Sequence, residues 1–362
     1  MRWPWARKGS GDQLVVSWSG DTLAYVLARA GADATYQVLK FGVERQGEDT
    51  LDAFIRRLQG LGLKGLEARF MLQPEQYQLL QIDAPAVPPE ELRAAARYQI
   101  REMLNTHVDD VTLDVMRVGD GEHKGSGNLF VVAATNEVVR AMLGLGDAMR
   151  WTVSVIDIQE TAQRNLQSAL AGRAGGADRA NAALVLAQGH QAVLTISANE
   201  ELFYTRRFDL PDGFLNGSWG HGSGAPGGAS DSFTPVEEYV PDYSVGGVSY
   251  GNDYTGRSVV PLSASAGDSV DDEAAQRFLV EVQRSLDVWD RSWSSMPLDG
   301  LRVYAGERSD ELSSWLGTQL GQTVMPLNVS AQFPGFEGGK VGDQALCLPL
   351  LGVLMWTESL KL

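Results

Sequence analysis

The sequence is short of the residues that hold small or metal-dependent folds together. It contains a single cysteine, Cys347, and only four histidines among 362 residues. One cysteine cannot close an internal disulfide, and scattered histidines without a second thiol leave no cluster with the spacing of a zinc site. We therefore expect no metal site, and the cytoplasm is the simplest compartment for this chain.

Basic residues are also scarce. The chain has 30 Lys and Arg against 46 Asp and Glu, a net charge of −16. This argues against a nucleic acid partner, because affinity for the phosphate backbone depends on cationic side chains. Half of the charge is local, since residues 231–273 hold nine acidic residues and one basic residue, Arg257. The body is only mildly acidic, so the argument is weaker for the body than for the whole chain.

Long hydrophobic runs are missing as well. The longest, 345–356, is about half of the ~20 residues that a membrane-spanning helix needs, and it contains Pro349. The basic N-terminus is followed only by the short apolar run 14–16, which does not make a signal peptide. Its Trp3 and Trp5 can touch a membrane surface, but we interpret this segment as a tail before the first strand.

One segment differs from the rest of the chain in composition. Residues 211–267 contain 12 glycines and no lysine, and their tyrosines follow neither a helical nor a strand period. Low aliphatic content with much Gly and Ser is typical of a segment that cannot bury enough surface to order itself. We predict a long flexible acidic loop, and its tyrosines leave open an ordering against the body or a partner.

The remaining residues show one pattern twice. In each half, three β-rich runs separated by short turns precede an amphipathic helix and a fourth strand. The first copy lies at 12–18, 23–29, 34–42, 51–58 and 65–71, and the second at 182–186, 192–197, 202–209, 278–293 and 301–305. This repetition predicts a duplicated α/β architecture.

An inserted α/β subdomain is predicted between the copies. Its first helix, expected over 90–104, buries one apolar face: Leu92, Ala96, Ile100 and Met103. The same helix carries an arginine stripe, Arg93, Arg97 and Arg101, which is usually a solvated face but is also a candidate docking surface in so acidic a chain. The predicted units are 1–72 (start of the first half), 73–150 (inserted subdomain), 151–181 (connecting helix) and 182–362 (second half).

Catalytic signatures are mostly absent. The glycines of 60–65 match the letters of a dinucleotide-binding motif, but they follow a helix and precede a strand, the reverse of the required order. A helix-stopping turn explains them better. Residues 338–340 end like a phosphate-binding loop but lack its first glycine and its Ser or Thr. We therefore predict no catalytic residue from motifs alone.

Four strings in this order and spacing carry a resemblance that covers nearly the whole chain outside 211–267. They are the sequences at 87–100, 155–162, 282–289 and 344–352. With the duplicated pattern and the insertion, the chain resembles the PilM/MshI family of type IV pilus assembly proteins, and its MSHA-pilus branch most. The resemblance implies a duplicated actin-like (ASKHA) fold with an inserted α/β subdomain.

The resemblance also implies where a nucleotide site would lie, and the residues there depart from the pattern. Two hairpins should each supply an Asp that holds Mg²⁺, and a glycine-rich loop should receive adenosine. The corresponding residues are Ser17, Ser19, Gly20 and Asp21 in the first hairpin, Ala187, Gln188 and Gly189 in the second, and Gly306 and Glu307 in the loop. We expect weak or no binding of Mg²⁺–ATP and no hydrolysis. In an alternative alignment, Asp21 holds the metal.

The function implied by the resemblance is that of a binding scaffold. It would bind the cytoplasmic N-terminal peptide of a PilN-type single-pass inner-membrane protein within a pilus assembly complex, at the inner-membrane face of the cytoplasm, with any membrane association made through this partner. Two alternatives stay open: an active actin-like ATPase that gates pilus assembly, and an L-type cytoplasmic component of type II secretion.

Overall fold

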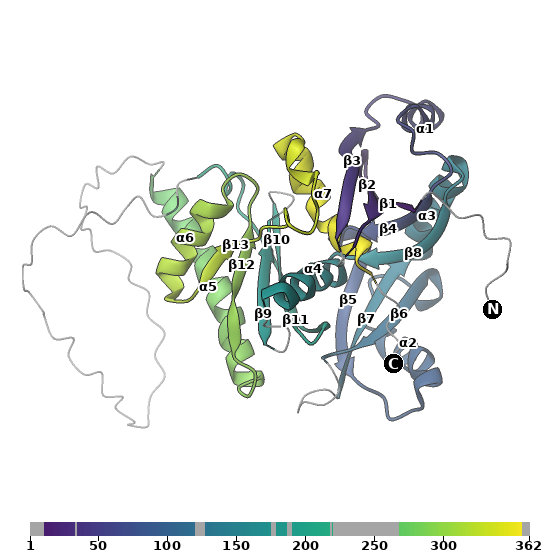
Figure 1. Cartoon of the computed structure of the whole chain (residues 1–362). Helices are drawn as coiled ribbons and strands as arrows, with labels where there is room; N and C mark the ends of the chain where they lie inside the picture. The colour runs from purple at the N-terminus through teal and green to yellow at the C-terminus, as the bar shows by residue number, and fades with distance from the viewer. Residues whose placement is uncertain are drawn as a thin grey trace, which may run out of the picture.

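The computed structural model describes residues 11–32, 35–119, 127–174, 179–186, 190–217, 219 and 268–356, with backbone only at 174 and 268–272. The N-terminal residues 1–10 and most of the acidic loop predicted at 211–267 lie outside this part of the chain. The described residues form three sheets surrounded by helices (Figure 1).

The first half is built on a five-stranded sheet with the order β3-β2-β1-β4-β8. Strand β2 is antiparallel to both of its neighbours, and β4 is parallel to both of its own. The strands are β1 (Asp12–Ser19), β2 (Thr22–Ala30), β3 (Tyr36–Arg45), β4 (Glu67–Leu72) and β8 (Thr152–Ile158). Helix α1 (Leu51–Gly60) ends at a turn where Gly62 has φ +82°, so these glycines stop a helix, as predicted.

The second half repeats this arrangement. Its sheet has the order β11-β10-β9-β12-β13, with the same alternation of antiparallel and parallel pairs. The strands are β9 (Ala180–Val185), β10 (Gln191–Ala198), β11 (Glu201–Asp209), β12 (Leu298–Tyr304) and β13 (Val324–Pro326). Helices α5 (Asp268–Ser292) and α6 (Ser309–Leu320) precede and follow β12. The duplication expected from the sequence is confirmed.

A three-stranded sheet with the order β5-β7-β6 lies between β4 and β8 in the sequence and is therefore inserted within the first half, not between the two copies. Its elements are η1 (Pro74–Gln76), β5 (Tyr77–Asp83), η2 (Pro89–Glu91), α2 (Leu92–Ile100), η3 (Val108–Asp110), β6 (Val111–Arg117), β7 (Asn128–Thr135) and α3 (Asn136–Met149). Leu92, Ala96 and Ile100 are buried as predicted, but Met103 is 47% exposed because the helix ends at Ile100. The prediction of a helix reaching 104 is therefore wrong at its C-terminal end.

This small sheet packs into the core of the second half. Val118 and Phe130 belong to the same hydrophobic cluster as Phe203 of β11. The Gly119 amide donates to the Leu202 carbonyl (2.8 Å), and a Cβ on Gly119, which has φ +71°, would lie 2.5 Å from the Phe203 ring. A close approach of this kind requires glycine. The inserted sheet therefore connects to the second half as well as to the first.

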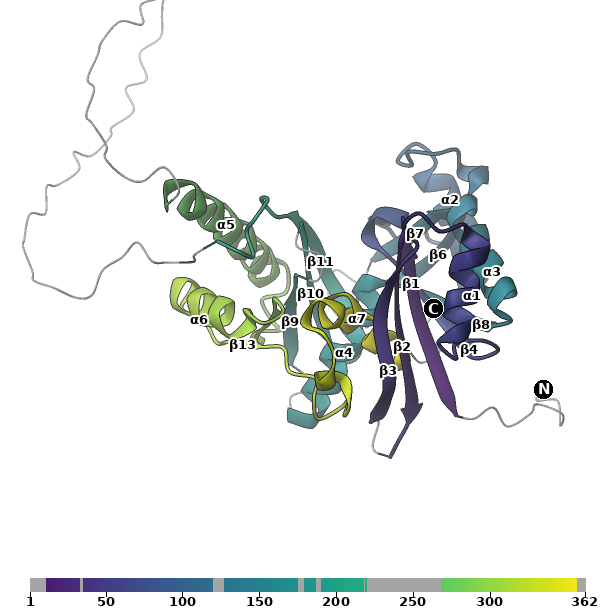
Figure 2. The same cartoon turned by 90° about the horizontal axis from the view of Figure 1, so that it is seen from above.

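The last helix of each half packs on the sheet of the other half. Helix α4 (Gln159–Ala174) follows β8 but lies against β9, β10 and β11, whereas α7 (Val341–Leu354), which follows η4 (Phe336–Gly338), lies against β1, β2 and β3. The two helices contact each other between the large sheets (Figures 1 and 2). A Cβ on Gly352 would lie 1.9 Å from the Ala162 carbonyl oxygen, so glycine sets their separation.

The segment 151–181 is not a connecting helix throughout. It begins with β8, which forms the edge of the first sheet, and only then continues as α4. The β-branched residues Thr152, Val153, Val155 and Ile156 favour the strand. The prediction of a helix for this part of the chain missed the fifth strand.

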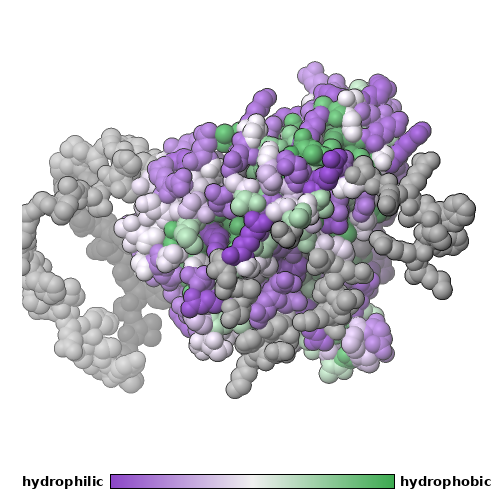
Figure 3. All heavy atoms as spheres, in the orientation of Figure 1, coloured by the Kyte–Doolittle hydropathy of each residue, from purple (hydrophilic) through white to green (hydrophobic). Residues whose placement is uncertain are grey.

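On the face drawn in Figure 3, the described surface is mainly polar, and hydrophobic side chains form small areas among hydrophilic ones. Exposed large apolar residues are spread over α1, α2, α3, α5 and β13, for example Leu51, Tyr98, Leu143, Val280 and Met325. Among the residues that the structure describes, no helix has the length and apolar character that crossing a bilayer requires.

Candidate functional site

The first predicted hairpin joins β1 to β2 through a two-residue turn. Ser19 pairs with Thr22, and Gly20 at the turn has φ +57°, a conformation that glycine adopts without strain. Asp21 is exposed at the tip, where its carboxylate accepts a hydrogen bond from the Thr22 hydroxyl (2.8 Å). Ser17 is 1% exposed, so the structure separates the buried and the exposed members of this predicted group.

The segment after β4 closes the hairpin with its own side chains. The side-chain amide of Gln73 donates to the Ser17 hydroxyl (2.5 Å), and the Ser19 hydroxyl donates to the Glu75 carboxylate (2.6 Å). The side-chain amide of Gln76 donates to the Trp18 backbone carbonyl (2.9 Å). The hydroxyls of Ser17 and Ser19, two of the residues at the predicted nucleotide hairpin, are therefore bound within the protein. Glu75 also brings a negative charge to Ser19, which would repel a phosphate.

The side chains around the first hairpin do not fit a Mg²⁺–triphosphate. The carboxylate nearest to the hairpin hydroxyls, Glu75, accepts from Ser19, and Asp21 lies at the exposed tip. Within the described part of the chain, no group of three or more His, Cys, Asp or Glu side chains is arranged to hold a metal ion. No catalytic step can be derived from these residues.

The second predicted hairpin, Ala187, Gln188 and Gly189, lies outside the described residues, but its flanks are described. The Leu186 amide donates to the Tyr304 carbonyl at the end of β12 (2.8 Å), and the His190 carbonyl accepts from the Leu210 amide after β11 (2.8 Å). The β9–β10 turn therefore begins and ends beside the carboxyl ends of β12 and β11.

The third predicted element, Gly306 and Glu307, joins β12 to α6. Gly306 has φ +60°, and the Ser309 hydroxyl donates to its carbonyl (2.7 Å) while accepting from the Ala305 amide (2.9 Å). The Glu307 side chain is exposed. The next residue, Arg308, turns inward and places its guanidinium carbon 3.8 Å from the centre of the Trp219 ring.

A buried charged cluster joins the halves near the first hairpin, and motif searching misses it. Glu160 at the start of α4 is 0% exposed; it accepts from the Tyr77 hydroxyl of β5 and from Arg207 Nε of β11 (2.8 Å). Arg207 also donates to the Pro74 carbonyl (2.8 Å). Burial, and then the charge of Glu160, raises the pKa of Tyr77 well above 10, so its phenol stays protonated. The cluster connects β5, η1, α4 and β11.

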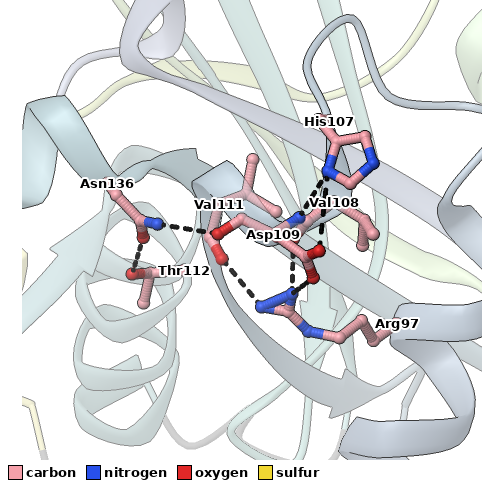
Figure 4. Close-up of polar contacts among 7 residues, drawn as sticks. All are labelled: Arg97, His107, Val108, Asp109, Val111, Thr112 and Asn136. Atoms are coloured by element: carbon pink, nitrogen blue, oxygen red, sulfur yellow. Dashed lines mark hydrogen bonds and ion pairs between the residues drawn. The ribbon is translucent and has the colours of Figure 1, made fainter.

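The arginine stripe of α2 is divided between two roles. Arg97 points toward the β6 side of the subdomain, where it donates to the Val108 carbonyl and to the Val111 carbonyl (3.0 Å) (Figure 4). Its neighbours are more exposed: Arg93 pairs with Asp114 (2.7 Å), and Arg101 lies 4.8 Å above the Tyr98 ring. Arg97 therefore holds the subdomain together, while Arg93, Arg101 and the 71% exposed Tyr98 form a surface.

A polar network around η3 supports the position of Arg97 (Figure 4). His107 Nδ1 accepts from the Asp109 amide (3.3 Å), and the Asn136 side chain joins the Asp109 carbonyl (3.1 Å) to the Thr112 hydroxyl (2.8 Å). His107 therefore has a local hydrogen-bond partner within this network.

A surface cavity of about 310 Å³ lies elsewhere in the second half. It is lined by residues of α4, β9 and the β10–β11 turn, including Ser168, Asn181 and Glu200. This turn is at the opposite end of β10 from the predicted second hairpin. The cavity therefore contains none of the predicted nucleotide residues.

Comparison with known proteins identifies the fold of this chain. No family model and no curated protein matches the sequence. Among solved structures, a chain of a PilM-PilN type IV pilus biogenesis complex is similar over 95% of this chain and 98% of its own length, with 16% identity and a TM-score of 0.61. The fold class predicted from the sequence, a duplicated actin-like fold with an inserted α/β subdomain, is confirmed.

Two further similar structures are more distant. The cytoplasmic domain of EpsL, an inner-membrane component of the type II secretion system of Vibrio cholerae, is 15% identical and covers 55% of this chain and 71% of its own, with a TM-score of 0.38. A Bacteroides thetaiotaomicron protein with an actin-like ATPase fold is 9% identical over 94% and 97% of the two chains, with a TM-score of 0.46. At these identities, similarity of structure concerns the fold alone.

Proposed function

We propose that this chain is a non-catalytic scaffold of type IV pilus assembly, of the MshI-like kind, which binds the N-terminal peptide of a PilN-type inner-membrane protein. The observation that carries the proposal is the likeness, over nearly the whole chain, to a protein from a PilM-PilN complex. The binding takes place in the cytoplasm at the face of the inner membrane, and membrane association is made through the partner.

Side chains at the predicted nucleotide residues support a scaffold over an ATPase. Ser17 and Ser19 are bound by Gln73 and Glu75, and Arg308 is stacked on Trp219. A scaffold does not need to open and close around a nucleotide. The ion pair between buried Glu160 of α4 and half-buried Arg207 of β11 is a ligand-independent contact of this kind of scaffold.

The inserted subdomain, predicted to span 73–150, is the proposed docking wall. The exposed Arg93 and Tyr98 of α2, with Arg101 directly after the helix, offer guanidinium donors and an aromatic ring to the carbonyl groups of an extended peptide. Arg97 contributes indirectly, because it fixes the loop beneath α2.

Peptide binding tests the proposal directly. A labelled synthetic peptide with the first dozen or so residues of the partner should bind, and Arg93→Ala/Arg101→Ala should weaken binding about tenfold, as expected when one or two hydrogen bonds to charged groups are lost. Arg140→Ala, an exposed arginine on α3, is the matched control and should bind normally. Absence of binding by the folded wild type would refute the proposal.

The ATPase alternative is separated by thermal unfolding with Mg²⁺–ATP. A ligand at 100 times its dissociation constant stabilises a protein by about 2.7 kcal/mol. We expect no such stabilisation, and micromolar affinity would favour the ATPase.

A further inference from the structure

The cavity of about 310 Å³ in the second half lies where a regular series of side chains on α4 is interrupted. Gln163 and Gln167 are one turn apart, and each donates to one carbonyl of β9 and one of β10. The next residue at this spacing is Ala171, which lines the cavity and is 3% exposed. Its methyl group leaves open the space that a third glutamine would fill.

A buried hydroxyl lies beside this space. On β10, the Thr195 hydroxyl donates to Gln167 Oε1 (2.6 Å). Ser197, two residues further along β10 and opposite Asn181 of β9, lines the cavity and is 2% exposed. Among the residues that the structure describes, its hydroxyl has no hydrogen-bond partner. Because a buried hydroxyl is normally hydrogen-bonded, Ser197 indicates a site for a polar ligand.

The acceptors around the cavity favour a positively charged ligand. Glu200 of the β10–β11 turn is the one charged side chain among the described lining residues. Ala171 and Gly172, which also line the cavity, belong to the last turn of α4, which ends at Ala174. The last four carbonyls of a helix have no partner within it and form the negative end of its dipole. A carboxylate, a hydroxyl oxygen and such carbonyls suit an ammonium group, which has three N–H donors.

The basic side chains near this end of α4 are engaged elsewhere. Arg302 of β12 donates to Asn181 Oδ1 (2.8 Å), and Asn181 Nδ2 donates to the Arg179 carbonyl (2.8 Å). Arg173 of α4 donates to the Ala331 carbonyl (3.2 Å). None of these arginines is among the described residues that line the cavity. The described lining therefore carries a single negative charge, which attracts a cation and repels an anion.

The turn that carries this charge is strained. Asn199 and Glu200, the two residues between β10 and β11, have φ +51° and +65°. Turns of this kind usually have glycine at the second position, because a side chain is unfavourable there. A glutamate held in such a conformation is more common at ligand-binding sites than elsewhere, since the strain fixes the direction of the side chain. The backbone therefore supports a binding role for Glu200.

We propose that this cavity binds a small primary amine in its ammonium form. The ammonium group donates to the Ser197 hydroxyl and to the carbonyls of the last turn of α4, and Glu200 supplies the opposite charge. The small side chains of Ala171 and Ala198, together with Gly172, leave room for the alkyl part of the ligand. The proposal goes beyond the scaffold function, because the cavity includes neither the predicted nucleotide residues nor the peptide surface of α2.

The first test compares two probes of equal length on the full chain by titration calorimetry: putrescine and the diol that has hydroxyl groups in place of its amines. We expect putrescine to bind at least about tenfold more tightly than the diol, because its hydrogen bonds are charge-assisted. Ser197→Ala and Glu200→Gln should each weaken putrescine binding about tenfold. Glu137→Gln, which removes an exposed carboxylate of α3, is the matched control and should bind normally.

A second test fills the cavity. Ala171→Gln adds the missing glutamine, so it should lower putrescine affinity at least about tenfold without lowering the unfolding temperature. Ala141→Gln, at an exposed position of α3, is its control and should leave binding unchanged. If Ala171→Gln does not fold, Gly172→Leu replaces it, because a Cβ on Gly172 has nothing within 4 Å.

Three outcomes would overturn the proposal. The folded wild type could fail to bind putrescine, it could bind the diol equally well, or a folded variant with a filled cavity could bind putrescine as the wild type does. The first would show that the cavity has no amine ligand, the second that charge plays no part, and the third that binding takes place elsewhere.

Discussion

Helices α4 and α7 each pack on the sheet of the other half, but they contact that sheet through different kinds of side chain. Helix α7, which lies on the first sheet, is apolar, with Leu348, Leu350, Leu351 and Val353 all buried. The face of α4 on the second sheet is instead polar, with Gln163 and Gln167 buried one turn apart. Packing of apolar side chains is not directional, whereas hydrogen bonds fix a register.

The glutamines of α4 bind the backbone of the second sheet. Gln163 Nε2 donates to the Ala183 and Val193 carbonyls (2.8 and 3.1 Å), and Gln167 Nε2 donates to the Asn181 and Thr195 carbonyls (2.8 and 3.1 Å). The side chains of α4 therefore bind the second sheet through several hydrogen bonds. On the other side, Arg69 of β4 donates to the Val353 and Leu354 carbonyls at the end of α7 (2.8 and 3.2 Å), and the packing is otherwise apolar.

The largest effect is expected where the two helices meet. In Gly352→Ala, the new methyl would lie 1.9 Å from the Ala162 carbonyl oxygen, which is backbone and cannot turn away. The helices must separate, at a cost of about 3 kcal/mol in the free energy of unfolding measured with urea. Gly342→Ala, near the start of the same helix with nothing within 4 Å, is the control and should not be destabilised. Equal stability of the two variants would contradict a close crossing.

A smaller loss of stability is expected where the glutamines of α4 contact the second sheet. Gln167→Leu leaves two carbonyls and the Thr195 hydroxyl, which donates to Gln167 Oε1 (2.6 Å), without their partner in a buried place. We expect a loss of about 2 kcal/mol, the usual cost of unsatisfied buried groups. Adding Thr195→Val removes one orphaned group and should recover part of the loss in a double-mutant cycle. Strictly additive losses would show that the bonds do not act together.

Over the interval from pH 9 to 10, the smallest effect on the free energy of unfolding concerns the single thiol, Cys347 of α7. Burial raises the pKa of Cys347 from 9.0 to about 12. Above pH 9 the unfolded chain loses this proton while the folded protein keeps it, so stability falls between pH 9 and 12 by up to about 1.4 kcal/mol per pH unit.

Cys347→Ala should remove this slope. The interval between pH 9 and 10 is the most informative, because the buried Tyr25 and Tyr304, whose pKa values are raised from 10.0 to about 12, add their own slope above pH 10. The measurement is the free energy of unfolding at several pH values. Parallel curves for the variant and the wild type would mean that the thiol reaches solvent.

The sequence predicted the parts of the fold that depend on local patterns. The strand runs and the buried face of α2 follow from periodicity. Strand β8 was missed because it is a short strand directly before a helix, and the expected helix absorbed it. The burial of Met103 was predicted wrongly because the helical spacing of apolar residues continues to position 103, whereas α2 ends at Ile100.

The residues that close the candidate site could not be predicted in the same way. Gln73, Glu75 and Arg207 reach their partners across 47 to 56 positions of sequence, and no motif relates them. Trp219 lies in a segment whose composition predicts a loop, and its role depends on a stack with a residue from another element. Pairings of this kind are set by the tertiary fold and carry no local signal.

The exchange of helices also has a consequence for synthesis on the ribosome. The first sheet emerges early, yet the helix that covers it, α7, spans Val341–Leu354. At roughly 5–20 residues per second, β1 to β3 wait tens of seconds for this cover. During translation the nascent first half therefore presents an apolar sheet face, and chaperones that hold such faces should bind it until the C-terminal helix leaves the exit tunnel.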